Sequence, residues 1–120
     1  MSESALQNIT IQQGAPYTDP FVYTDEAGDP VDLTGFSAIL TARKYNGGPV
    51  VFEWSTTEGT LTIPTPTDGQ IVPAVGAATT AAYDFSKIVY DMFIYNDSDV
   101  PTKLIRGYAK LERSETDNAD

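Results

Sequence analysis

The amino-acid sequence predicts an all-β protein, an antiparallel β-sandwich of about seven or eight strands with one short helical turn. Short segments of alternating apolar and polar residues recur along the chain, as half-buried strands require. Clusters of glycine, proline, asparagine and aspartate separate these segments at intervals of roughly 8 to 12 residues. No window of about 12 residues carries the apolar stripe of an amphipathic helix. A small closed barrel is the structural alternative.

Three strands are predicted in the first part of the chain. Residues 9–12 alternate isoleucine with polar side chains, which predicts an edge strand within an N-terminal arm of residues 1–16. A second strand covers residues 21–23 and ends at the turn-forming residues 25–30. The alternation over residues 36–43 is longer and places leucine and small alanines on one face, which predicts close packing between sheets.

Two hairpins and a short helix are predicted in the middle of the chain. The first hairpin turns at residues 46–49, Asn-Gly-Gly-Pro, and returns through residues 50–54. A second hairpin joins residues 59–63 to residues 70–73. Residues 74–85 are rich in alanine and threonine, and we expect them to form a short crossover helix of one or two turns.

The last two strands complete the predicted domain. Residues 88–95 are apolar on both faces, which places this strand centrally and leaves its outward residues to meet another element or a partner. Residues 102–111 form the final strand, so the sandwich is expected over residues 17–113. The polar, acidic residues 114–120 contain no large apolar side chain, and we expect them to be disordered. This strand pattern is typical of an immunoglobulin-like sandwich.

The composition excludes several kinds of chemistry. The chain has no cysteine and no histidine, so disulfides, thiolate metal sites, a thiol nucleophile and an imidazole base are all absent. The net charge of −10 disfavours nucleic acid and anionic membranes as partners. No apolar run of about 18 residues predicts a transmembrane helix. Residues 1–13 lack the features of a signal peptide, which predicts synthesis and folding in a cytosol.

The acidic residues are interpreted as solvent-exposed turn and strand positions rather than as a catalytic or metal site. The acids of residues 25–32 do not match the ligand spacing of an EF-hand loop. Two pairs, Glu53 with Glu58 and Asp84 with Asp91, would suit a glycosidase only if a cleft held them together. We therefore expect no catalytic residue, no metal ligand and no cofactor.

Most aromatic side chains are expected to fill the core. Val50, Phe52 and Trp54 are predicted to share the inward face of their strand, with Trp54 as a core anchor. Tyr90 is a candidate for the hydroxyl hydrogen bond that braces the tyrosine corner of immunoglobulin-like sandwiches. Exposed aromatics would also suit stacking on a glycan, which keeps a carbohydrate-binding role open.

Four residues are predicted to bind a partner. Tyr45 and Tyr95 lie beside predicted turns, where aromatic side chains often anchor an interface. Ile9 and Ile11 belong to the N-terminal arm, which could add to the sheet edge of a neighbouring protein through main-chain hydrogen bonds. On this hypothesis, deletion of residues 1–13 should abolish assembly while leaving the core folded.

A series of short motifs resembles one protein family. The motifs run in order from Asp25 to Arg113 and include Asp32-Leu33-Thr34-Gly35-Phe36, Ala42-Arg43-Lys44, Asn46-Gly47-Gly48-Pro49-Val50, Gly69-Gln70-Ile71, Val89-Tyr90-Asp91 and Leu104-Ile105-Arg106-Gly107. Their order and spacing resemble those of the N-terminal domain of the baseplate upper protein of tailed bacteriophages. The resemblance implies an immunoglobulin-like fold and a role in virion architecture.

The expected function is therefore that of a bacteriophage virion structural protein. A small subunit of this kind would decorate or connect capsid, neck, tail or baseplate proteins, in multiple symmetric copies, after synthesis in the host cytoplasm. The chain lacks the long coiled-coil or receptor-binding region of the larger family members, which favours an accessory subunit. The alternative is a carbohydrate- or cell-surface-binding module, and an enzyme is the third hypothesis.

Overall fold

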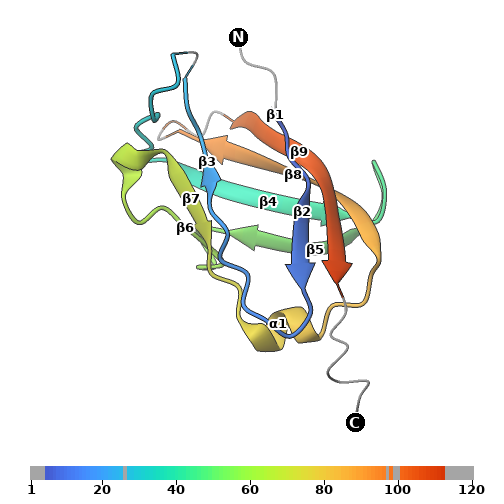
Figure 1. The fold of residues 1–120 in the computed structure, drawn as a ribbon. Coiled ribbons are helices and arrows are strands. Elements are labelled where there is room, and N and C mark those ends of the chain that lie inside the picture. Colours follow the sequence, from blue (N-terminus) through green and yellow to red (C-terminus); the bar gives the residue numbers. More distant parts are fainter. Residues whose placement is uncertain (1–4, 26, 97, 99–100, 113–120) are drawn as a thin grey trace.

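The computed structural model describes residues 5–25, 27–96, 98 and 101–112, and these form a two-layer β-sandwich (Figure 1). The larger sheet has the strand order β1-β9-β8-β4-β5, and β2 also pairs with β9. The smaller sheet has the order β3-β7-β6. The strands are β1 Ala5–Leu6, β2 Ile9–Gln12, β3 Phe21–Val22, β4 Ser37–Arg43, β5 Val50–Ser55, β6 Leu61–Thr62, β7 Gln70–Pro73, β8 Lys87–Tyr95 and β9 Pro101–Glu112. The predicted tail, residues 114–120, lies outside the described residues.

The strand order is that of an immunoglobulin-like domain. Such a domain places strands B, E and D in one sheet and strands C, F and G in the other, and variable-type domains add strand C′ beside C. Here β3, β7 and β6 occupy the B, E and D positions, while β4, β5, β8 and β9 occupy C, C′, F and G. The chain is therefore an all-β, immunoglobulin-like sandwich, as the sequence predicts.

The N-terminal arm pairs with the last strand of its own chain. Both β1 and β2 run parallel to β9, with Ile9 opposite Ala109 and Ile11 opposite Leu111. This register turns both isoleucines into the core, where Ile9 is 5% exposed and Ile11 is 0% exposed. The prediction that they bind a neighbouring protein is wrong for this structure, because the chain's own sheet already takes up the arm.

The core between the sheets is built around an aromatic cluster. The ring of Trp54 lies 4.7 Å from that of Phe52 and 5.4 Å from that of Tyr17, measured between centroids. The Trp54 indole N–H donates a hydrogen bond of 3.0 Å to the Tyr83 hydroxyl, so the one polar group of this side chain is satisfied. Trp54 is thus the core anchor that the sequence predicts.

One predicted inward residue points outward instead. Val50 was expected on the same face as Phe52 and Trp54, but it is 51% exposed. The pairing of β4 with β5 shifts register between Ala42 and Arg43, so that Arg43 faces Val50. A bulge adds one residue to a strand and breaks the alternation of its faces at that point, which moves Val50 out of the core.

The short helix α1, Ala77–Ala81, connects β7 to β8, as predicted for this alanine-rich segment. A second short helix, the 3-10 turn η1, Pro66–Asp68, precedes β7. The buried Thr80 hydroxyl donates to the carbonyl of Ala15 at 2.8 Å and accepts from the N–H of Gly14 at 3.1 Å, which ties α1 to the segment that follows β2. Among the described residues, no helix is both long and apolar enough to span a membrane.

Candidate protein-binding surface

The larger sheet has one side without a second layer. The smaller sheet covers its inner side, and the strands and helices that the structure describes do not cover the other side (Figure 1). We call this other side the outer face. Because strand side chains alternate, the register assigns the outward residues of β4, β8 and β9 to it. Those with described side chains are Ser37, Ile39, Thr41, Arg43, Lys87, Val89, Asp91, Phe93, Tyr95, Pro101, Arg106, Tyr108, Lys110 and Glu112.

One half of the outer face is apolar. Ile39 lies directly opposite Phe93, and Tyr95 lies at the end of the same strand, opposite Ser37. All three apolar side chains are half-buried. The residues of β8 that alternate with Phe93 and Tyr95 point to the inner side of the sheet and are buried in the core. We call Ile39, Phe93 and Tyr95 the apolar half. The place of β8 between β9 and β4 confirms that this largely apolar strand is central in the sheet, as its sequence predicts.

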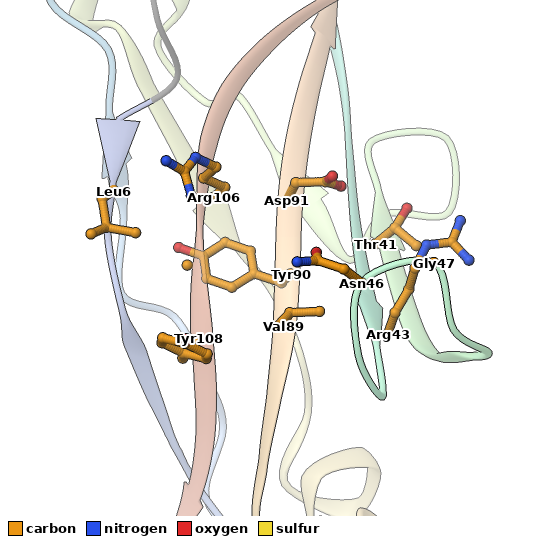
Figure 2. Close-up of a pocket in the computed structure, with 11 residues that line it drawn as sticks. Leu6, Thr41, Arg43, Asn46, Gly47, Val89, Tyr90, Asp91, Arg106 and Tyr108 are labelled. Carbon is orange, nitrogen blue, oxygen red and sulfur yellow. The ribbon is translucent and has the colours of Figure 1, made fainter.

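The other half of the outer face is basic and contains a hollow of about 340 Å³, the basic pocket (Figure 2). Figure 2 shows Leu6 of β1 at one side, residues of β8 and β9 in the middle, and the turn after β4 at the other side. Arg43 and Arg106 both line it, together with Val89 and Tyr108. The remaining lining residues are Leu6, Thr41, Asn46, Gly47, Tyr90, Asp91 and Gly107.

Hydrogen bonding and ring contacts hold the walls of the basic pocket. Nη1 of Arg43 donates to the carbonyl of Gly48 at 3.0 Å, which fixes the guanidinium against the hairpin turn. Nζ of Lys87 lies 4.6 Å from the centroid of the Tyr108 ring, a cation–π contact that occupies one face of this 46% exposed ring. The pocket therefore offers positive charge beside apolar surface.

The two tyrosines predicted to bind a partner lie at opposite ends of β4. Tyr45 follows the end of β4 and is 60% exposed, and a Cβ atom on Gly48 would lie 2.7 Å from its ring. The ring thus rests on its own turn. Tyr95 belongs to the apolar half, beside Ser37 at the start of β4. The structure does not bring these two side chains together.

Tyr90 has a different role from the one predicted. Its hydroxyl donates a hydrogen bond to the carbonyl of Gln7, which lies between β1 and β2. The hydroxyl therefore braces the N-terminal arm, not the connection before β8 where a tyrosine corner would act. Burial, with a smaller contribution from Tyr17, raises the pKa of Tyr90 well above its usual range. The group stays a neutral hydrogen-bond donor at physiological pH.

The acidic side chains serve loops and strand edges. Asp25 Oδ1 accepts hydrogen bonds from the N–H groups of Ala27 and Asp29 at 2.9 and 3.0 Å. The Thr34 hydroxyl and N–H both donate to Asp32, and these bonds lower the pKa of that carboxyl. Glu53 accepts from the Thr41 hydroxyl at 3.2 Å. Within the described residues, no three such groups lie together in a way that could hold a metal ion.

Sequence reasoning missed the residues of the basic pocket. Leu6, Arg43, Arg106 and Tyr108 come from three strands that are far apart in the sequence. One signal was present: the first 42 residues contain no lysine or arginine, so all seven basic residues follow them. This asymmetry indicates a charged surface built by the later strands, although it does not identify the pocket.

Comparisons with known proteins add little to this description. No family model matches the chain, and no curated protein matches it. Among solved structures, the chain is similar to one titled "Drosophila OTK, extracellular domains 3-5", with 14% sequence identity and a TM-score of 0.39. The match covers 93% of this chain and 34% of that chain, so this chain spans about a third of its length. The fold class therefore rests on strand order and register.

Proposed function

We propose that this protein is a bacteriophage virion structural protein that packs against other virion proteins through the outer face. The observation that carries the proposal is the apolar half of that face. Ile39, Phe93 and Tyr95 form a contiguous apolar surface on the two central strands of the larger sheet. Surfaces of this kind, bordered by charged residues, are typical of sites of protein–protein contact.

The sequence motifs supply the virion context. Their resemblance to the N-terminal domain of phage baseplate upper proteins favours a subunit present in many symmetric copies beside capsid, neck, tail or baseplate proteins. Binding, rather than catalysis, is the proposed mechanism. A rigid sheet presents its side chains with little loss of conformational entropy on docking, so even a modest apolar area contributes to affinity.

A glycan-binding role has less support. Stacking on a sugar needs a free aromatic face. The ring of Tyr45 rests on Gly48, and Lys87 lies over one face of Tyr108. We therefore rank this alternative second, and glycan-array binding that is lost on Tyr45→Ala or Tyr108→Ala would favour it over the virion role.

The test is co-sedimentation with virions or capsids from which the protein has been omitted. We expect saturable, stoichiometric binding of the wild-type protein. Ile39→Thr keeps a β-branched residue in the strand but removes apolar area from the apolar half, and it should weaken binding at least about tenfold. The matched control is Val22→Thr, because Val22 is a 52% exposed strand valine on the smaller sheet. Absence of wild-type binding to any particle would refute the proposal.

A further inference from the structure

Three basic residues lie at one end of the larger sheet. All seven lysines and arginines lie beyond residue 42. Arg43 ends β4, Lys87 begins β8, and Lys110 lies near the end of β9. The register sets Arg43 beside Val89, Val89 beside Tyr108, and Asp91 beside Arg106, so the three strands present their charges in adjacent rows. The positive charge is concentrated on and around the basic pocket.

Two of these charges oppose each other at a cost in stability. Lys87 and Lys110 face each other directly across β8 and β9. Like charges in this position destabilise a sheet, and Asp91 alone among the lining residues of the pocket carries negative charge. The lining of the pocket holds two arginines and one aspartate, a net charge of +1, in a chain whose net charge is −10. Such an excess is suited to an acidic partner.

The same molecule carries a matching acidic segment. Residues 24, 25 and 27–30, the acidic loop, follow β3 and project beyond the smaller sheet (Figure 1). The isolated bridge between Thr24 and Pro30 closes the loop, and the two hydrogen bonds to Asp25 Oδ1 brace it. Asp29 is exposed. Because these bonds hold Asp25, Ala27 and Asp29, the described part of the loop would lose little entropy on binding.

The loop and the pocket cannot meet within one molecule. The acidic loop precedes β4, whereas the Arg43 side of the pocket lies at the end of β4. A strand of seven residues separates them by about 20 Å. Between two molecules, however, the two surfaces are complementary in charge. The pocket, at about 340 Å³, has room for one or two side chains of a loop tip.

We propose that copies of this protein associate head to tail, with the acidic loop of one copy seated in the basic pocket of the next. Asp29 pairs with Arg106, and Leu6 and Tyr108 cover the loop from the side. The contact is heterologous, so successive copies form a ring where the rotation closes and a chain where it does not. At physiological ionic strength the screening length is about 8 Å, which limits the repulsion between molecules of net charge −10.

Association of the purified protein tests this inference without particles, so its outcome is independent of the virion role. In sedimentation velocity at physiological ionic strength, we expect the wild-type protein to grow beyond a dimer as its concentration rises. Raising the salt about tenfold should weaken association, because the contact is partly electrostatic. Asp29→Lys and Arg106→Glu should each lower association at least about tenfold, while far-ultraviolet circular dichroism confirms that both variants fold.

The decisive experiment mixes the two variants. Each retains one intact surface: the loop in Arg106→Glu and the pocket in Asp29→Lys. A heterologous contact therefore predicts that the mixture associates, as 1:1 dimers or larger species, although each variant alone is monomeric. Glu58→Lys is the control, since it makes the same change in net charge at an exposed residue between β5 and β6. It should associate like the wild type.

Three outcomes would overturn the proposal. In the first, the wild-type protein stays monomeric up to about 1 mM. In the second, the mixture of the two variants stays monomeric. In the third, the Asp29→Lys variant still dimerises by itself. The last result would point to a symmetric contact between two outer faces. If Arg106→Glu fails to fold beside Asp91, Arg106→Gln replaces it, since it removes the charge without placing two acids side by side.

Discussion

At the scale of single residues, Gly107 determines how closely the N-terminal arm approaches the larger sheet. Gly107 lies in β9 opposite Tyr90, and a Cβ atom at this position would collide with the carbonyl of Gln7. That carbonyl also accepts the Tyr90 hydroxyl hydrogen bond. One glycine therefore permits both the close approach and the buried hydrogen bond.

Gly107→Ala should destabilise the protein by about 1 to 3 kcal/mol, because the added methyl group meets backbone rather than a movable side chain. Urea unfolding followed by the fluorescence of the single, buried Trp54 measures the free energy of unfolding. The control is Gly76→Ala, since nothing lies within 4 Å of a Cβ atom there. We expect it to cost less than about 1 kcal/mol. Equal effects of the two substitutions would contradict the role given to Gly107.

At the scale of secondary structure, the N-terminal arm is part of the sandwich. Parallel pairing of β1 and β2 with β9 satisfies the main chain of the last strand and buries two isoleucines. From the sequence alone, we expect that removal of the arm leaves the core folded. The structure reverses this expectation, because the arm completes both the sheet edge and the core.

Deletion of residues 1–13 should therefore unfold or strongly destabilise the protein. The loss of Ile9 and Ile11 alone removes about 3 to 6 kcal/mol of burial, comparable to the stability of a small domain. Thermal melting by circular dichroism checks this prediction. A synthetic peptide of residues 5–13 added in trans should restore part of the melting temperature by filling the vacated edge. A truncated protein that melts like the full chain would show that the arm is dispensable.

At the scale of the whole molecule, buried tyrosines link folding to alkaline pH. Burial, with the nearby Asp19 carboxylate, raises the pKa of Tyr17 to about 12. Burial likewise raises the pKa of Tyr83 and of Tyr90. An unfolded tyrosine has a pKa near 10, so above that pH the unfolded chain releases protons that the folded protein retains.

The free energy of unfolding should consequently be level between about pH 6 and 9 and fall as the pH rises from about 10 to 12. Each affected tyrosine contributes a slope of about 1 kcal/mol per pH unit. Urea unfolding at several pH values measures the slope, and Tyr17→Phe should reduce it, because phenylalanine does not ionise. An unchanged slope in Tyr17→Phe would mean that Tyr17 does not take part.

The sequence by itself determined the fold class, most strand positions, the short helix and the role of Trp54, because these depend on local periodicity and on burial of large apolar groups. Tertiary structure alone decided that Ile9 and Ile11 are buried. The alternation of their segment predicts an edge strand, but it does not show which strand that edge strand pairs with. It also decided that Val50 faces solvent, because the bulge at Val51 of β5 is not encoded in local alternation. The basic pocket likewise exists only in the folded chain, where pairing of β4, β8 and β9 places Arg43, Tyr108 and Arg106 around one hollow.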